Sequence, residues 1–432
     1  MSLLTLIRLP AAVVALLPLP AVAIGSSPAG AEPVTIVFES YNYGTAGVGG
    51  AGTQQLIDEF EASHPDIDIE PVGTPTAEIH ISVQTQAAAG DPPDVAQIGL
   101  SKLAFVLENL PYVPYNEFVD PAELETHLAG MLPSVVAVAE RGSDLVGIPY
   151  SLSTPTLMIN ADLFREAGLD PANPPRTWEV AEAAALAITD SGAQGVYVDA
   201  ANEAKSDFLT QTLINSNGGQ VMDAAGNPTF DSPEAVGAMA MLADLTASGA
   251  QPAVSESEAL ALFEAGELGM LVTSTAALAG LVESTDGQFE LTTAGIPAFG
   301  NQPLAPTVSG AALFVFADDP ARQAAAWEFV TFLTGDRGQT IVSSQIGYLP
   351  LRPAIIDDPD GLAPFLAEDG RLLPAIEQLQ NIVPYQVFPG PDGTRATQML
   401  QDDAVAPIML SGADPESTLT AVAGDVRDLL GS

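Results

Sequence analysis

Short apolar runs and amphipathic helical runs alternate through the chain after an apolar leader. VTIVFES (34–40) has the pattern of a buried strand, TQQLIDEFEASHP (53–65) that of an amphipathic helix, and IDIEPVG (67–73) that of a second strand. The order repeats with a helix over IHISVQTQAAAG (79–90) and a short strand over 94–98. This alternation predicts βαβ units, and therefore an α/β fold whose sheet is wound and mostly parallel.

The rest of the chain also contains predicted strands and helices. TPTLMIN (154–160), residues 269–272 and GAALFVF (310–316) have the pattern of strands. A helix is expected to begin after Thr177, a residue suited to an N-cap, and another to occupy residues 416–430. At 432 residues the chain is long enough for two domains.

The leader predicts export. In MSLLTLIRLPAAVVALLPLPAVAIGSSPAGAEP, Arg8 precedes an uncharged apolar run, and a small-x-small site follows at 29–31, so residues 1–31 are interpreted as a cleaved secretory signal peptide. The apolar run contains three prolines and falls short of the ~20 residues of a membrane-spanning helix. The chain has no cysteine, which excludes disulfides, thiolate metal sites and a lipid-modified N-terminal cysteine. We therefore expect a periplasmic protein without a lipid anchor.

Charge excludes several partners. The chain has 55 acidic and 12 basic residues, a formal net charge of -43, so nucleic acid and anionic membranes are poor partners. Self-repulsion of this size is relieved by salt, and a saline habitat is one explanation for it. No internal repeat or long low-complexity tract is present.

A glycine-rich turn raises a dinucleotide-binding hypothesis. Gly47, Gly49 and Gly52 spell G-x-G-x-x-G between the first strand and the first helix, and Glu70 follows at about the distance of a ribose-binding acid. The alternative is that these glycines serve tight turn geometry and close approach at the mouth of a cleft.

Six phrases, in order, carry a family resemblance: EFEASHPDIDIEPV, AAAGDPPDVAQI, GIPYSLSTPTLMINADLFREAGLDPANPPRTWEV, LFEAGELGMLVT, AAWEFVTFLTG and IGYLPLRPA. They resemble the extracellular solute-binding proteins of ABC importers, the class that includes maltose-binding protein. STPTLMINADLFREAGLDPANPPRTW and GYLPLRPA are especially similar to the periplasmic binding proteins for glycerol-3-phosphate and glycerophosphodiesters. The resemblance displaces the dinucleotide hypothesis, since it covers nearly all of the mature chain.

The resemblance implies a type II periplasmic-binding-protein fold, in which two α/β lobes close on a ligand about a hinge. The expected crossings lie near residues 148–152, 306–310 and 347–351. Each lobe is then discontinuous. The N-terminal lobe comprises 32–150 and 310–345, and the C-terminal lobe comprises 151–309 and 346–432.

The resemblance also implies ligand-binding residues. Arg395 aligns with an arginine that holds phosphate, a task that suits a permanently charged bidentate donor; the alternative is a pairing with one of the many acids. Tyr348, Gly310 and Ser153 align with family positions near the ligand. Arg352 is a second, weaker candidate cation.

Further candidate ligand-binding residues either differ from the residue that the glycerol-phosphate binders carry at that position or lie where a helix follows a strand. Thr76 replaces an aromatic residue of the glycerol-phosphate binders, Leu100 replaces an acid, and Asp207 replaces a tryptophan, so the hydroxyl-recognising side of the pocket is altered. Ser274 and Thr275 begin a helix after a strand, which suits either anion binding or an ordinary N-cap.

Sugar stacking would depend on tyrosines, because both tryptophans lie in helices with a structural pattern. The candidates are Tyr41, Tyr43, Tyr150, Tyr348 and Tyr385.

Catalytic patterns are weak. The three histidines show no H-E-x-x-H spacing, no G-x-S-x-G occurs, and we expect neither a metal nor a cofactor. A carboxylate pair of a glycosidase is not excluded by counting acids, so an exported glycan-active enzyme stays a remote alternative. The sequence predicts a non-catalytic, monomeric binding protein that delivers glycerol-3-phosphate or a glycerophosphodiester such as glycerophosphocholine to the permease subunits of an ABC transporter. A neutral oligosaccharide of the maltose or trehalose type is the alternative ligand.

Overall fold

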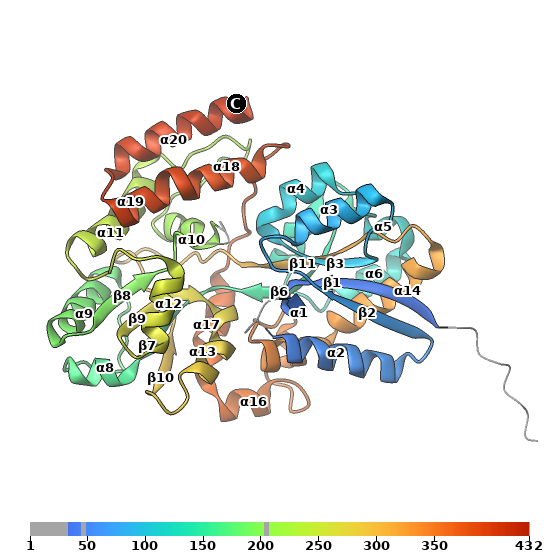
Figure 1. Cartoon of the computed structure of the whole chain (residues 1–432), viewed down its shortest axis with the longest axis horizontal. Helices are drawn as coiled ribbons and strands as arrows, with labels where there is room; N and C mark the ends of the chain where they lie inside the picture. Colours follow the sequence, from blue (N-terminus) through green and yellow to red (C-terminus); the bar gives the residue numbers. More distant parts are fainter. Residues whose placement is uncertain (1–32, 45–48, 203–206, 432) are drawn as a thin grey trace, which may run out of the picture.

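The computed structural model describes residues 33–44, 49–202 and 207–431. The predicted signal peptide and Gly47 lie outside these ranges. The described chain forms two lobes side by side, each built on its own sheet, with strand β6 (Ile148–Ser153) running between them (Figure 1). No helix within these ranges is long and apolar enough to cross a membrane.

The sheet of the first lobe has the strand order β2-β1-β3-β11-β6. β1 pairs in parallel with β2 and β3, whereas β11 pairs antiparallel with β3 and β6. Besides β6, the strands are β1 (Val34–Ser40), β2 (Ile67–Gly73), β3 (Val95–Gly99) and β11 (Ser309–Val315). A two-stranded hairpin, β4 (Glu140–Arg141) and β5 (Asp144–Leu145), lies outside this sheet.

The sheet of the second lobe has the order β10-β7-β9-β8. Only β8 and β9 pair in parallel, and β7 is antiparallel to both of its neighbours. The strands are β7 (Pro155–Asn160), β8 (Gln194–Val198), β9 (Leu268–Ser274) and β10 (Leu291–Ala294).

The prediction of a mostly parallel sheet is wrong for both lobes. In both sheets, antiparallel pairs occur where a strand enters from the other lobe. No crossover helix precedes such a strand, so it does not have to run parallel to its neighbour. Strand position and the βαβ start were nevertheless predicted correctly, since β1, β2 and β3 match the expected runs.

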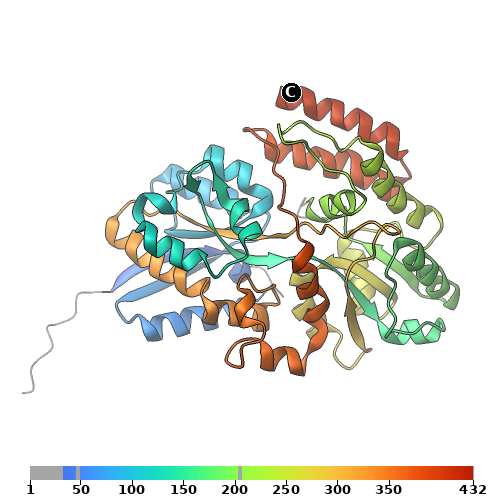
Figure 2. The same ribbon diagram turned by 180° about the vertical axis from the view of Figure 1, so that it is seen from behind.

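Helices cover both sheets (Figure 2). Those of the first lobe are α1 (Tyr41–Gly44), α2 (Gly50–Ser63), α3 (Ile79–Ala89), α4 (Leu103–Asn109), α5 (Tyr115–Phe118), α6 (Pro121–Leu128), α7 (Pro133–Val136), α14 (Pro320–Leu333) and α15 (Asp336–Ile341). Those of the second lobe are α8 (Ala161–Glu166), α9 (Trp178–Ser191), α10 (Phe208–Ser216), α11 (Pro233–Ala247), α12 (Glu256–Glu264), α13 (Leu278–Ser284), α16 (Ala363–Glu368), α17 (Leu373–Gln378), α18 (Gly393–Met399), α19 (Ala406–Ser411) and α20 (Pro415–Leu430).

Helix ends follow the local sequence. α9 begins at Thr177, whose side-chain oxygen accepts a hydrogen bond from the Val180 N–H at 3.4 Å, as the N-cap prediction requires. α3 ends at Gly90, which has a φ of 85°, a left-handed conformation that favours glycine. Local capping therefore fixes where helices start and stop.

Three chain passages between the lobes are bonded to one another. β6 runs straight into β7, and Ser153 at its end pairs with Ser309 at the start of β11. The third passage joins them because the Leu349 N–H donates to the Leu152 carbonyl at 2.7 Å. The lobes also meet away from these passages, where α18 contacts α4.

The glycine-rich turn has a packing role. Gly49 has a φ of 70°, and a Cβ built on it would lie 2.3 Å from Cγ2 of Ile346, in the π-helical turn η4 (Val342–Ile346). A Cβ on Gly52 would lie 2.7 Å from the same side chain. These glycines therefore let α2 approach η4 closely, which supports the structural interpretation over the dinucleotide hypothesis.

Candidate functional site

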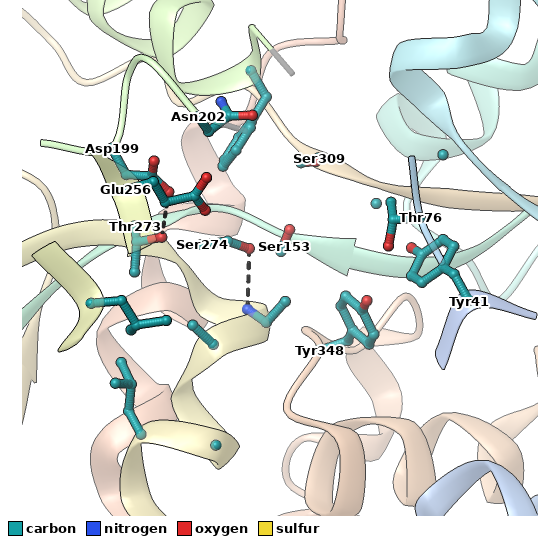
Figure 3. Close-up of a pocket in the computed structure, with 18 of the residues that line it drawn as sticks. Tyr41, Thr76, Ser153, Asp199, Asn202, Glu256, Thr273, Ser274, Ser309 and Tyr348 are labelled. Carbon is teal, nitrogen blue, oxygen red and sulfur yellow. Dashed lines mark hydrogen bonds between the residues drawn. The ribbon is translucent and has the colours of Figure 1, made fainter. Parts of the chain in front are cut away.

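A cavity of about 690 Å³ lies between the lobes, beside the passages that join them (Figure 3). The first lobe lines it with Tyr41, Thr76, Ser101 and Lys102, together with Tyr348 from the third passage. The second lobe contributes polar residues of a different kind: Asp199, Asn202, Glu256, Glu264, Thr273 and Glu283. Its size is typical of a small-molecule site.

A buried hydrogen-bond network supports the first-lobe wall. Ser151 of β6 lies at its centre, where its Oγ accepts from the Ala311 N–H of β11 at 3.1 Å and lies 3.3 Å from the Tyr41 hydroxyl. Gln97 of β3 extends the network, since its Nε2 donates to Asn42 and its Oε1 accepts from Ser40 Oγ at 2.6 Å. The network thus crosses four adjacent strands and holds Tyr41 at the cavity.

The two cavity tyrosines are neutral hydrogen-bonding groups. Burial raises the pKa of Tyr41 above its usual value and raises the pKa of Tyr348 well above it, and the neighbouring Tyr41 adds to the effect on Tyr348. Figure 3 shows both rings on the same side of the cavity, near Thr76. This wall therefore offers hydroxyls that both donate and accept.

The second-lobe wall is rich in carboxylates. Asp199 follows β8 and accepts a hydrogen bond from Thr273 Oγ1 of β9 at 2.8 Å, which fixes its carboxylate beside the sheet edge. Glu256, at the start of α12, lies next to Asp199, and both lie across the cavity from Tyr41 and Tyr348 (Figure 3). Carboxylates in such a position accept hydrogen bonds from hydroxyls or attract a cation.

Lys102 is the one cation among the described residues that line the cavity. It ends the short helix η1 (Leu100–Lys102) after β3, and only 7 % of its surface is exposed. Burial lowers its pKa, and the carboxylate of Asp207 opposes that decrease. Asp207 is itself fully buried behind the wall, where the Tyr385 hydroxyl and Gln211 Nε2 (3.0 Å) donate to it.

The structure brings six of the ten predicted site residues to the cavity: Tyr41, Thr76, Ser153, Ser274, Gly310 and Tyr348. Ser274 also caps η3 (Thr275–Ala277), because its Oγ accepts from the Ala276 N–H at 3.1 Å. Their contact with a ligand stays a prediction.

The other four predicted residues do not line the cavity. Leu100 and Asp207 are buried and do not reach the cavity surface. Thr275 is also buried, and its Oγ1 accepts a hydrogen bond from the Thr154 N–H at 3.3 Å. Arg395 is exposed on α18. The phosphate-binding role of Arg395 thus stays a prediction that this cavity does not require.

Arg352 and most candidate tyrosines have structural positions. Arg352 is buried in the first lobe, where it donates to the backbone carbonyls of Thr334 (2.6 Å) and His127 (2.7 Å). Tyr150 and Tyr385 are buried, whereas Tyr43 is exposed and donates to Gln54. Sugar stacking would therefore depend on Tyr41 and Tyr348, with Phe208 as a further ring at the cavity.

The residues that sequence reasoning missed are mostly charged. Lys102, Asp199 and Glu256 line the cavity but were not predicted. Lys102 carried a usable signal, because one of only two lysines in the chain lies shortly after the predicted strand 94–98. In the part of the chain that the structure describes, no group of three or more histidine or carboxylate side chains is arranged to hold a metal ion.

Comparison with known proteins matches this architecture to one family. A profile of the family described as "Bacterial extracellular solute-binding protein" matches residues 44–340. The chain is 27% identical over 355 residues to the sn-glycerol-3-phosphate-binding periplasmic protein UgpB of Brucella melitensis, covering 78% of this chain and 80% of that one.

Solved structures agree on the fold. UgpB from Mycobacterium tuberculosis in complex with glycerophosphocholine superposes with a TM-score of 0.80 at 23% identity, covering 93% of this chain and 99% of that one. The cyclic alpha-maltosyl-1,6-maltose binding protein from Arthrobacter globiformis gives 0.78, also at 23% identity, with 92% and 99% covered. The predicted fold class, two α/β lobes of a type II periplasmic binding protein, is confirmed.

Proposed function

Because the chain belongs to the bacterial extracellular solute-binding protein family, we propose that it captures a glycerol-phosphate compound in the interlobe cavity and delivers it to an ABC permease. The cavity carries the proposal, since it lies at the junction of two lobes joined by three bonded passages, where closure would enclose a small solute. Export through the predicted signal peptide to the periplasm is part of the same proposal.

We infer the substrate class from the ligands of similar proteins and from the side chain of Lys102. The Brucella relative is named for sn-glycerol-3-phosphate, and the Mycobacterium structure holds glycerophosphocholine. Lys102 gives the cavity a cation, and the hydroxyls of Tyr41 and Tyr348 suit a glycerol moiety. Glycerol-3-phosphate or a glycerophosphodiester is therefore the proposed ligand.

A neutral oligosaccharide is the second candidate. The Arthrobacter protein, named for a cyclic maltosyl-maltose, has nearly the same TM-score as the Mycobacterium protein. The hydroxyls and carboxylates of the cavity also suit sugar hydroxyls, and Phe208 offers an apolar ring.

A thermal-shift screen at low and high salt separates the two ligands. It compares glycerol-3-phosphate, glycerophosphocholine and other glycerophosphodiesters with maltose and trehalose. A ligand at 100 times its Kd adds about 2.7 kcal/mol of stability, so a rise in Tm of several degrees is expected for a phosphate compound. A rise with sugars alone would transfer the protein to the oligosaccharide branch. Mass spectrometry of the recovered ligand checks that it is returned unchanged, which an enzyme would not do.

The Arg395→Ala variant tests the residue that the resemblance assigns to phosphate. Loss of phosphate-ligand affinity in a folded variant would return Arg395 to the site. Unchanged affinity would remove it and leave the cavity cation as the phosphate partner.

A further inference from the structure

The two lobes contact each other at a place away from the three passages that join them. Helix α4 of the first lobe contacts helix α18 of the second lobe. A Cβ added to Gly393, the first residue of α18, would lie 3.1 Å from the Cβ of Ala104 in α4, and Ala104 is buried. Two small residues therefore let the helices approach closely, and the lobes pack directly on each other at this point.

A pair of opposite charges joins the lobes next to this contact. Lys102 directly precedes α4, and Asp207 directly precedes α10 of the second lobe. Both residues are buried, and their charges attract each other. Asp207 accepts hydrogen bonds from the Tyr385 hydroxyl and from Gln211, and Gln211 also donates to the Gln386 carbonyl at 2.8 Å, in the segment that leads to α18. We call Lys102, Ala104, Asp207 and Gly393 the interlobe clasp.

Long-range electrostatics acts against the clasp. The first-lobe segments, 33–152 and 309–352, have 21 acidic and 5 basic residues, and the second-lobe segments, 153–308 and 353–432, have 33 acidic and 6 basic residues. Both lobes are therefore strongly negative, and they repel each other.

Salt affects the two opposing interactions unequally. The Debye length decreases from about 30 Å at 0.01 M salt to about 3 Å at 1 M, so salt removes most of the repulsion between exposed charges on different lobes. A buried ion pair is screened much less, and salt does not separate two packed helices. The balance between clasp and repulsion therefore shifts towards the clasp as the salt concentration rises.

We propose that the interlobe clasp closes the lobes without a ligand, and that the salt concentration sets the closed fraction because salt screens the repulsion between the lobes. At low salt the repulsion holds the cleft open, and at high salt the clasp holds it closed. The proposal concerns the ligand-free protein, so it does not depend on which solute the cavity takes.

A distance measurement between the lobes of the full mature chain tests the proposal. The chain has no cysteine, so Ala62→Cys and Ala183→Cys place spin labels at exposed positions on α2 of the first lobe and α9 of the second. Unfolding and refolding first remove any bound solute, and pulsed electron spin resonance then gives the distribution of label distances. We expect the ratio of closed to open molecules to rise about tenfold or more between 0.05 M and 1 M potassium chloride.

Asp207→Asn separates the clasp from the effect of net charge. The substitution makes the second lobe less negative, so by repulsion alone it would favour closure. It also removes the negative partner of Lys102, and we therefore expect the ratio of closed to open molecules to fall about tenfold at 1 M salt. The matched control is Asp190→Asn, at an exposed position on α9, which makes the same charge change and should not lower the ratio.

Ala104→Leu tests the helix contact independently of charge. The larger side chain meets α18 of the other lobe, so we expect it to open the cleft at every salt concentration. The control Ala122→Leu adds the same atoms at an exposed position on α6 and should leave the distances unchanged. Circular dichroism checks the folding of each variant, and the two substitutions in the clasp keep the proposal testable if one of them does not fold.

Three outcomes overturn the proposal. A distance distribution that is the same at all salt concentrations rejects control by salt. An Asp207→Asn variant that closes as readily as Asp190→Asn rejects the charge pair, and an Ala104→Leu variant with wild-type distances rejects the helix contact. Because no ligand is present, none of these results bears on the proposed substrate, which the thermal-shift screen tests separately.

Discussion

The two walls of the cavity are made in different ways. The first-lobe wall presents hydroxyls whose positions are fixed by a network of buried hydrogen bonds across four strands, centred on Ser151. The second-lobe wall presents carboxylates on α12, α13 and the segment after β8, at the surface of the cavity. The first-lobe wall thus supplies hydroxyls held in a fixed geometry, and the second-lobe wall supplies most of the cavity's carboxylates among the described residues.

The largest expected effect is on a strand that follows one of the passages between the lobes. Gly310 of β11 has a φ of 140°, and a Cβ added to it would lie 1.9 Å from the Ser151 carbonyl oxygen. Gly310→Ala should therefore destabilise the protein by more than about 3 kcal/mol, since backbone has to move at the crossing. Urea unfolding measures the loss.

The control for this variant is Gly300→Ala. Gly300 also has a positive φ, 55°, but nothing lies within 4 Å of its added Cβ. It should cost only about 1 kcal/mol from backbone strain. Equal losses in the two variants would show that the close approach of β11 to β6 at Gly310 does not add to the cost of the substitution.

The next largest effect is a loss of stability at low pH, which we expect in the first lobe and not in the second. All three histidines lie in the first lobe, and burial, aided by the charge of Lys102, lowers the pKa of His80 to about 4. Between the unfolded pKa of about 6.5 and pH 4 the unfolded chain binds a proton that the folded lobe does not, so stability falls as pH falls. The loss approaches about 3 kcal/mol at pH 4.

His80→Gln isolates this contribution. The variant should show a smaller loss of stability than the wild type between pH 7 and pH 4, whatever constant offset the substitution adds. Hydrogen exchange followed by mass spectrometry should find wild-type protection lost first in the first lobe, because the second lobe has no histidine. An unchanged pH slope in the variant would contradict the assignment.

The smallest effect tests the network behind the tyrosines. Ser151→Ala removes the acceptor of the Ala311 N–H and the partner of the Tyr41 hydroxyl, and should cost about 1–2 kcal/mol in urea unfolding together with a reduced ligand affinity. Ser343→Ala is the matched control, since no hydrogen-bond partner of that buried hydroxyl is found in the described structure. If the Ser151 variant is as stable as this control, the hydrogen-bond network does not stabilise the first-lobe wall.

The helices and strands were predicted well, because the sequence patterns that indicate them are local. Strand runs, the Thr177 cap and the Gly90 helix end depend on neighbours in the chain, and the structure confirms them. The mixed strand order was missed, because the period of a strand does not encode the direction of its partner. Pairing is decided by how the chain passes between lobes.

The candidate site was predicted unevenly for a related reason. Ser153 and Tyr348 lie in or beside the crossing segments and Tyr41 follows the first strand, so a family pattern places them at the cavity. Asp199 and Glu256 belong to a chain with 55 acids, where a single carboxylate carries no local signal. Only their convergence in space distinguishes them from the acids of the surface.

The three bonded passages form a ribbon, and a ribbon is mechanically anisotropic. It bends across its flat face with little distortion of the hydrogen bonds between Ser153 and Ser309 or between Leu349 and Leu152, whereas bending within its plane or shearing would break them. Bending across the flat face is therefore the relative motion of the lobes that these hydrogen bonds oppose least.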